Sequence, residues 1–401
     1  MSIEIEPLTD AFGKPETWKN PYPVYREFRE KAPFVAQWPV TTLDGNIMQA
    51  RAWMLLKHEQ VNAALRDPVT FSSVQPNAGL VAPKLVLIQD DPPRHTRFRR
   101  LVNKAFTARR IAELEPWIKS VAEQLLDKMP VGESVDAVDK FTMPLPVQVI
   151  ARMLGIPGDD QTAFRRWSDA LVSFNGGDFS PADRVKNGME MMDYFRKTAA
   201  DRVGKGGADL ISALVEAEVE GERLEDWELL AFCILLLVAG NETTTNLMSN
   251  MLAIMVERPD VWRRVRDDRA LVEAVIEETL RYHSPVQMLT RRVTRDIVIG
   301  TQPIHEGEVV AVSYGAANRD PAVFANPESY EIERDLSKHL GFGAGIHYCL
   351  GAPLARMEAG IMLNAMLDRF SAVTAGDGEP QRQTATNLLF GFRKLPLKFL
   401  A

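Results

Sequence analysis

The sequence predicts a mainly α-helical protein with small β regions. Apolar residues recur at helical spacing in four long segments, Ile111–Met129, Pro181–Arg202, Ala270–Tyr282 and Leu350–Phe370. Strand-like alternation clusters in three stretches, near Phe34–Leu56, Val286–Ser313 and Phe390–Leu400. No linker, internal repeat or low-complexity tract divides the chain, so we expect a single domain over residues 1–401.

The glycine- and proline-containing segments between helical patterns are expected to be surface loops. Two of them lie near Ser173–Asp183 and Gly204–Gly207. With 46% hydrophobic and 25% charged residues, the 401-residue chain can bury a large core. The net charge of −7 argues against a nucleic-acid partner.

The cysteine content and the N-terminus bear on where the protein works. The chain has only two cysteines, and one of them, Cys233, lies inside an apolar segment, so we expect no disulfide. The acidic start of the chain has no apolar signal region or anchor. These features predict a soluble protein of the reducing cytoplasm without a membrane anchor.

A long apolar segment, Leu229–Val256, contains a single formal charge, Glu242. The uninterrupted apolar run ends at Gly240 and is too short for the about 20 residues of a membrane span, so we expect a core helix. A buried carboxylate is either paired or functional. Gly240 and the run Thr243-Thr244-Thr245 are expected to weaken the helical ladder and to open a local bulge beside the acid.

The other cysteine lies in a glycine-dense loop, Gly341-Phe-Gly-Ala-Gly-Ile-His-Tyr-Cys-Leu-Gly351. Glycines allow positive φ and a close approach to a flat ligand. A thiolate in an apolar setting needs a metal or hydrogen-bond donors, because burial alone raises the thiol pKa. From Leu350 the chain turns helical, so its first amides could face the sulfur. The pattern predicts that Cys349 is a metal-bound thiolate.

Other interpretations of this loop fit less well. A closed zinc site needs four ligands, and the two cysteines show no paired spacing with each other or with histidines. A dinucleotide loop would need a third glycine where the chain has Ile346. A cysteine nucleophile needs a base, and the position of His347 two residues away does not ensure contact.

The pattern Phe342-Gly-x-Gly-x-His-x-Cys349-x-Gly351 resembles the haem-binding loop of the cytochrome P450 monooxygenases in their soluble bacterial form. The resemblance covers nearly the whole chain. It implies the fold of that family, a triangular helical domain with a long central helix over the haem. It also implies haem b, iron protoporphyrin IX, with Cys349 as the axial iron ligand and His347 at a propionate.

The segment Ala239-Gly-Asn-Glu242-Thr243-Thr is similar to the oxygen-activation motif of the family's central helix. The resemblance implies that Glu242 and Thr243 relay protons during oxygen activation. Many bacterial members have Asp where this chain has Glu242. The extra methylene affects the geometry of the relay and leaves the acid in place.

Two further sets of charged residues match family positions. Glu278 and Arg281 lie three apart on one helical face, which is common on exposed helices, but they resemble the family's Glu-x-x-Arg pair. With Arg334 they would form a buried structural network. The remaining matches are cations that the resemblance places at the two haem propionates: His95 and Arg99, which are one helical turn apart, and Arg291.

The resemblance also implies partners. The segment Arg94–Arg110 is locally basic and would lie on the thiolate side of the haem, so we expect it to dock an acidic iron–sulfur ferredoxin that delivers electrons from its reductase. Docking by charge predicts that high ionic strength slows electron transfer. We expect a monomer.

The family's substrate contacts fall on apolar positions here, which predicts a small-to-medium hydrophobic organic substrate that receives one oxygen atom from O2. Phe390 would narrow the pocket. The expected pocket residues are Leu80, Val81, Leu235, Ala239, Val286, Leu289, Leu389 and Phe390. Two alternatives to monooxygenation are a peroxygenase driven by hydrogen peroxide, against which the pair Glu242 and Thr243 speaks, and a haem-binding sensor without turnover.

Overall fold

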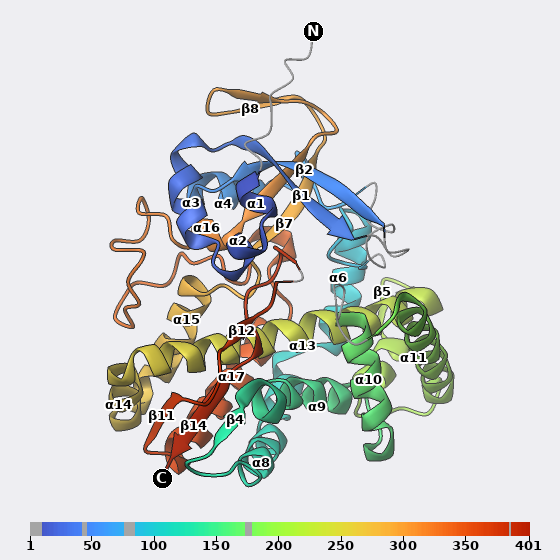
Figure 1. Ribbon diagram of the computed structural model, residues 1–401. Coiled ribbons are helices and arrows are strands. Elements are labelled where there is room, and N and C mark those ends of the chain that lie inside the picture. Colours follow the sequence, from blue (N-terminus) through green and yellow to red (C-terminus); the bar gives the residue numbers. More distant parts are fainter. Residues whose placement is uncertain (1–9, 42–45, 76–84, 173–178, 385) are drawn as a thin grey trace. The chain divides into compact units, whose positions relative to one another are not determined.

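The computed structural model describes residues 10–41, 46–75, 85–172, 179–384 and 386–401 (Figure 1). The chain forms two compact units, each assembled from three segments. The first, here called the sheet unit, comprises Met1–Pro83, Ala274–Cys349 and Arg382–Gly391. The second, the helical unit, comprises Lys84–Glu273, Leu350–Gln381 and Phe392–Ala401. The expectation of a single domain stays a prediction.

The sheet unit is built on a five-stranded sheet with the order β1-β2-β10-β7-β3. Its strands are β1 (Phe34–Thr41), β2 (Ile47–Leu55), β10 (Val309–Ser313), β7 (Met288–Val293) and β3 (Phe71–Ser72). Only β10 and β2 pair in parallel, whereas the other neighbours are antiparallel. Val310 pairs with Trp53 on one side and with Arg291 on the other, which puts Arg291 in a central part of the sheet.

Short helices and a hairpin complete the sheet unit. They are α1 (Asp10–Gly13), α2 (Pro15–Lys19), α3 (Tyr22–Phe28), α4 (His58–Arg66), α16 (Tyr314–Ala317) and the hairpin of β8 (Ile297–Ile299) with β9 (Gln302–Ile304). A buried apolar cluster joins the sheet to the cysteine loop, since Val310 and Val312 share it with Tyr314 and Ala344. The helix α15 (Val272–Tyr282) enters this unit from residue 274 on.

The helical unit is organised around one long helix, α13 (Asp226–Glu257) (Figure 1). It starts with a capping box between Glu225 and Glu228 and ends at Glu257, two residues before Pro259, which would clash with a continued helix. It packs against α9 (Pro144–Met153), α10 (Gln161–Val172), α11 (Pro181–Arg202) and α17 (Ala352–Arg369).

The other elements of the helical unit surround this core. Its helices include α6 (Arg94–Ala105), α7 (Ala108–Ala112), α8 (Glu115–Leu126), α12 (Leu210–Glu216) and α14 (Pro259–Asp267). Its three-stranded sheet has the order β11-β14-β4, with β11 (Ala372–Ala375), β14 (Pro396–Leu400) and β4 (Ser134–Asp136). Two small strands, β5 (Glu218–Val219) and β6 (Glu222–Arg223), form a hairpin before α13.

The mainly helical class with small β regions is confirmed, and the helix Pro181–Arg202 is found at its predicted bounds. The continuous helix over Ile111–Met129 was wrong. The helix is interrupted between α7 and α8. Pro116 lies in the first turn of α8, where its missing N–H costs no intrahelical hydrogen bond. Of the loop expected near Ser173–Asp183, residues 173–178 lie outside the described residues, and α11 begins at Pro181 as the helical pattern predicts. The segment Gly204–Gly207 is an exposed loop between helices, as predicted.

The central helix differs from its prediction in one respect. It is α-helical throughout residues 226–257, so the bulge expected near the threonine run is wrong. The side chain of Thr243 bonds the carbonyl oxygen of Ala239 inside the intact ladder. By length and composition α13 could cross a membrane, but 61% of its apolar window is buried inside the structure, as in a core helix.

Candidate active site

Cys349 lies in an irregular loop of the sheet unit, after a single 3₁₀ turn at Gly345–His347. It is in no disulfide, and its side chain is partly exposed. Its own amide donates to the carbonyl of Phe342 at 3.0 Å, which closes the loop around the cysteine. Regular helix starts at Ala352, two residues later than predicted.

Two glycines shape this loop. Gly343 and Gly345 have φ of +73° and +67°, a region that residues with a Cβ avoid. A Cβ on Gly345 would lie 2.3 Å from the carbonyl oxygen of Leu65 in α4, whereas a Cβ on Gly343 would meet nothing closer than 3.9 Å. The loop therefore depends on Gly345 for both its conformation and its packing.

Three polar residues of the sheet unit lie around the cysteine loop. His347 Nε2 is 2.9 Å from the hydroxyl of Ser73. Arg291 is 4% exposed, and its Nη1 donates to the carbonyl of Thr290 at 2.8 Å. Burial raises the pKa of the Tyr314 hydroxyl, while the charge of Arg291 lowers it and that of Cys349 raises it. Arg291 and Cys349 are therefore each close enough to Tyr314 to act on it electrostatically.

Arg291 has no acidic partner within the ranges that the structure describes. A buried guanidinium without a counter-ion is costly, because the protein interior solvates charge poorly. An anion supplied from outside the chain would remove that cost.

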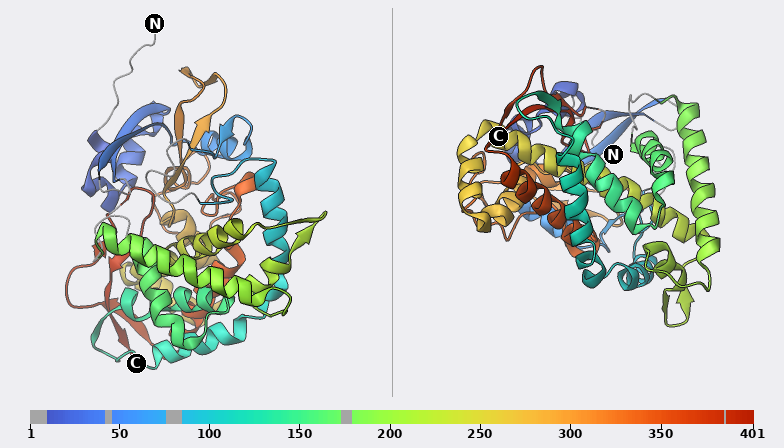
Figure 2. Two further views of the ribbon diagram at one scale, coloured as in Figure 1. Left: turned by 90° about the vertical axis from the view of Figure 1, so that its right-hand side faces the viewer. Right: turned by 90° about the horizontal axis from the view of Figure 1, so that it is seen from below.

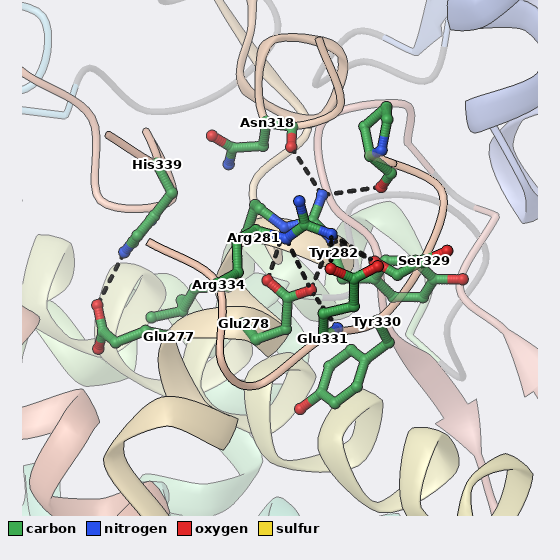
Figure 3. Close-up of polar contacts among 12 residues, drawn as sticks. Glu277, Glu278, Arg281, Tyr282, Asn318, Ser329, Tyr330, Glu331, Arg334 and His339 are labelled. Carbon is green, nitrogen blue, oxygen red and sulfur yellow. Dashed lines mark hydrogen bonds and ion pairs between the residues drawn. The ribbon is translucent and has the colours of Figure 1, made fainter. Parts of the chain in front are cut away.

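The structure brings the predicted charged network together (Figure 3). Arg281 Nε and Nη2 donate to the two carboxylate oxygens of Glu278 at 2.6 and 2.7 Å, and both side chains are fully buried. The remaining N–H groups of Arg281 donate to the carbonyl oxygens of Asn318, Pro327 and Ser329 at 2.8 to 3.0 Å. All five donors of the guanidinium are thus satisfied.

Arg334 is the second arginine on the same carboxylate. Its Nε lies 3.5 Å from Glu278 Oε1, and its Nη2 lies 3.1 Å from the half-exposed Glu331. Glu278 Oε1 also accepts the backbone N–H of Glu331 at 2.8 Å. Glu278 is therefore the shared anion of two buried cations and one amide.

This network continues to the start of the cysteine loop. Asn318, whose carbonyl accepts from Arg281, uses its side-chain oxygen to accept the N–H of Leu340 at 2.6 Å. Beside it, His339 Nε2 lies 2.8 Å from Glu277, and its Nδ1 accepts the N–H of Gly341 (Figure 3). The first residues of the loop are thus held by side chains that the buried arginine and α15 position.

In the helical unit, Glu242 and Thr243 lie on a face of α13 that is less buried than the rest of the helix. Ile234, Val238 and Ala239 are partly exposed on the same stretch, whereas most neighbouring positions are fully buried. Burial nevertheless raises the pKa of Glu242 to about 8. The carboxyl group is therefore mostly protonated at neutral pH.

Other residues hold this stretch of α13 in place. Asn241 Nδ2 donates to Ser168 of α10 at 2.5 Å, and Thr245 donates to the carbonyl of Thr142 at 3.1 Å. Gly240 lies against Ile150 of α9 so closely that a Cβ would be 2.7 Å from its Cδ1. Sequence reasoning missed Asn241 and Thr245, although polar residues four apart in an apolar helix could have indicated them.

The basic pair on α6 is also placed by the helical unit. The helix begins at Arg94, directly after Pro93. His95 is 2% exposed, and burial lowers its pKa, with the charge of Arg99 acting in the same direction. His95 and Arg99 are therefore close on one helix face, as their spacing predicts.

Comparison with known proteins gives a consistent result. The family model for cytochrome P450 matches residues 163–401. Cytochrome P450 109 of Bacillus spizizenii is 38% identical over 385 residues, which cover 94% of this chain and 91% of that protein. The chain belongs to the cytochrome P450 family. Its predicted family and fold are confirmed, and like its relatives it is a haem b monooxygenase.

Two further cytochrome P450s extend the comparison. Cyclomarin C epoxidase of Salinispora arenicola is 39% identical over 361 residues, covering 87% of this chain and 91% of that protein. The crystal structure of CYP109E1 from Bacillus megaterium in complex with testosterone is similar with a TM-score of 0.83 and 35% identity, covering 95% of this chain and all of that one.

The residues of this cytochrome P450 fit haem. A partly exposed cysteine thiol outside any disulfide suits a ligand of the haem iron, and a buried arginine without a carboxylate in the described ranges suits a propionate. Cys233, the other thiol, is buried within α13, and its pKa is raised to about 12, which makes it a poor ligand.

The predicted apolar pocket residues fall in different surroundings. Leu80 and Val81 lie outside the described residues. Val286 forms an isolated bridge with Leu389, and Val286 and Leu289 pack partly buried against the cluster of Tyr314 and Ala344. In the helical unit, Ala239 is partly exposed beside Glu242.

Two of the predicted pocket residues are buried instead. Leu235 is 4% exposed, so the neighbouring Val238, which sequence reasoning missed, offers more surface. Phe390 is 2% exposed and packs its ring against Tyr22 and His283. These contacts place Phe390 in the core of the sheet unit and do not support its role in narrowing a pocket.

Proposed function

We propose that this cytochrome P450 hydroxylates, or oxidises in a related way, a compact hydrophobic molecule with one oxygen atom from O2. Cys349 is the proposed axial ligand of the haem iron. The observation that carries this proposal is the loop, shaped by Gly343 and Gly345, that presents the partly exposed thiol of Cys349, together with the buried Arg291, which has no acidic partner among the described residues. The haem supplies the oxidative chemistry, and the chain supplies binding, orientation and protons.

Arg291 and His347 of the sheet unit, with His95 and Arg99 of the helical unit, are the proposed partners of the two propionates. Arg291 contributes a fixed positive charge at neutral pH. The hydrogen bond between Ser73 and Nε2 of His347 fixes the orientation of the imidazole ring, and this ring is the proposed propionate contact. These contacts would orient the cofactor as well as bind it.

Glu242 and Thr243 are the proposed proton carriers. With a pKa of about 8, Glu242 holds a proton at neutral pH and can release it without a large driving force. The hydroxyl of Thr243 donates to the carbonyl oxygen of Ala239 at 2.5 Å, so the lone pairs of its oxygen remain able to accept a hydrogen bond from a neighbouring donor. The pair can therefore pass protons on without leaving the helix.

The proposed substrate class rests on the apolar side chains at and near the predicted pocket positions. Val238 and Ala239 of α13, and Val286, Leu289 and Leu389 of the sheet unit, are hydrophobic. A similar structure holds testosterone, and one relative is named as an epoxidase of cyclomarin C. These names support a hydrophobic organic substrate of small to medium size.

We further propose an acidic ferredoxin as the electron donor and a soluble, monomeric cytoplasmic protein. The ferredoxin would deliver two electrons one at a time, and its reductase would reduce it again after each transfer. The small number of cysteines, neither of them in a disulfide, suits a reducing compartment.

The absorption spectrum of the reduced protein with carbon monoxide tests the central assignment. We expect a strongly red-shifted Soret band that is lost in Cys349→Ala and moved in Cys349→His, while Cys233→Ala leaves it unchanged. An unchanged band in Cys349→Ala would refute thiolate ligation by Cys349. Turnover driven by peroxide alone, faster than turnover with ferredoxin and its reductase, would favour a peroxygenase.

A further inference from the structure

The basic side chains of α6 face an acidic hairpin of the same unit. The hairpin of β5 and β6 stands beside α6, about 120 residues later in the chain (Figure 2). Its sequence, Glu218-Val-Glu-Gly-Glu222-Arg, has a carboxylate at every second position before the final arginine. We call this segment, residues 218–223, the acidic hairpin.

Three cations of α6 bind the acidic hairpin. Arg100 makes a two-pronged contact with Glu220, with N–O distances of 3.0 and 2.8 Å. Arg97 Nε lies 2.9 Å from Glu222, and Lys104 Nζ donates to the carbonyl oxygen of Glu218 at 2.6 Å. The hairpin therefore follows the helix over two turns, and its carboxylates pair with two of the helix cations, Arg97 and Arg100.

The turn of the hairpin supports a specific role for Glu220. Its φ is +56°, and Gly221 follows with φ of +81°. Glycine, asparagine and aspartate are the usual residues in such a turn, because a larger side chain in the left-handed region is strained. Glu220 occupies this position and uses its carboxylate on Arg100, which lowers the pKa of Glu220.

The contacts differ in how readily they open. Arg97 also holds both oxygens of Glu228 at 3.0 Å, and Glu228 is only 4% exposed by its side chain, so this pair is a fixed joint between α6 and α13. By contrast, the side chains of Arg100 and Glu220 are 45% and 72% exposed, and Glu222 is 53% exposed. Exposed pairs are weak and a hairpin of two short strands is marginal.

We propose that the acidic hairpin competes internally for the basic face of α6, so that an acidic ferredoxin must displace the carboxylates of Glu220 and Glu222 in order to dock there. This inference rests on the proposed ferredoxin donor. The partner that fits this face presents carboxylates spaced like those of the hairpin. Displacement exchanges one set of ion pairs for another, so it needs no change in the fixed joint of Arg97 with Glu228.

The competition changes the expected salt dependence. With the hairpin in place, the carboxylates of Glu220 and Glu222 offset part of the positive field of α6, so the rate of association with an acidic partner responds less to ionic strength. Without the hairpin carboxylates, the guanidinium of Arg100 and the Nε edge of Arg97 lose their partners while Arg97 stays paired with Glu228, and both the attraction and its screening by salt increase.

The test compares the intact holoenzyme with Glu220→Gln/Glu222→Gln, using a plant-type [2Fe–2S] ferredoxin and its reductase as the donor. We expect the KM for ferredoxin to fall about three- to tenfold, the contribution of two exposed ion pairs, with kcat at saturating ferredoxin unchanged. The decrease of the rate with salt should become steeper. Haem content and peroxide-driven turnover should match those of the wild type.

The matched control is Asp193→Asn/Asp377→Asn, which removes two negative charges from exposed ion pairs with Lys197 and Lys398 on other elements. If the control lowers the KM as much as the hairpin variant, net charge accounts for the effect and the proposal fails. If both enzymes accept electrons and the hairpin variant keeps the wild-type KM and salt slope, the competition is refuted while the donor stands. If neither binds the ferredoxin, the proposed donor and the competition both fall.

Discussion

Replacing Glu278 by glutamine should strongly destabilise this cytochrome P450. The substitution keeps the size of the side chain and removes the anion that two buried arginines share. Arg281 would lose charge-assisted bonds of 2.6 and 2.7 Å in a place where neither side chain reaches solvent. The glutamine amide would also bring N–H groups toward donors, among them the amide of Glu331.

The magnitude follows from the burial of the pair. Removing one partner of a buried ion pair costs about 3–5 kcal/mol, because the other charge stays desolvated. A chain of this kind has only about 5–15 kcal/mol of stability, so the loss is a large fraction. Urea unfolding followed by far-ultraviolet circular dichroism measures the change, and the carbon monoxide spectrum should report a smaller fraction of haem-loaded protein, since Asn318 links Arg281 to Leu340 of the cysteine loop.

Glu331→Gln is the matched control. It makes the same change three residues from Arg334, but its side chain is 43% exposed, so we expect a loss below about 1 kcal/mol. A second comparison is Glu278→Gln/Arg281→Met, which should lose less than the sum of its single variants, because the unpaired charge is gone. If Glu278→Gln unfolds within about 1 kcal/mol of the wild type, the shared-anion account of the network is wrong.

Two more changes test the cysteine loop and the acid of α13. Gly345→Ala should abolish most haem loading, because its Cβ would lie 2.3 Å from the carbonyl oxygen of Leu65. Gly343→Ala has a similar φ and no close neighbour, so it should lower the free energy of unfolding by only about 1 kcal/mol. Equal haem content in the two variants would contradict the packing argument. Glu242→Gln should remove a pH dependence of the free energy of unfolding. In the wild type, the carboxyl group of Glu242 keeps its proton up to a pKa of about 8 in the folded protein and releases it near 4.5 in the unfolded chain, so the stability falls by up to about 5 kcal/mol as the pH rises between these values. Unfolding curves with the same pH slope in both proteins would exclude a raised pKa.

The features that the sequence predicted correctly are those that depend on residues close together in the chain. The helix Pro181–Arg202 has a serine cap, a proline in its first turn and regular apolar spacing, and these act within a few residues. The cysteine loop could also be recognised from the sequence, since its glycines and its cysteine lie within eleven consecutive residues, Gly341–Gly351. The break at Pro116 was missed because periodicity continues across it.

Tertiary structure decided the properties that depend on residues far apart in sequence. The fractional burial of Leu235 and Phe390 could not follow from their hydrophobicity, because hydrophobic residues serve cores and pockets alike. The raised pKa of Glu242 comes from desolvation by the helices packed around α13, and the lack of a carboxylate for Arg291 within the described residues is a property of the folded sheet unit.

The basic segment of α6 shows the division most clearly. The sequence by itself determined that its charges lie together on a helix, because helical spacing is local. Only the fold determined that an acidic hairpin about 120 residues away covers them. Electrostatic pairing depends on distance in space, and the distance between two charges on different elements is set by the packing of the whole unit.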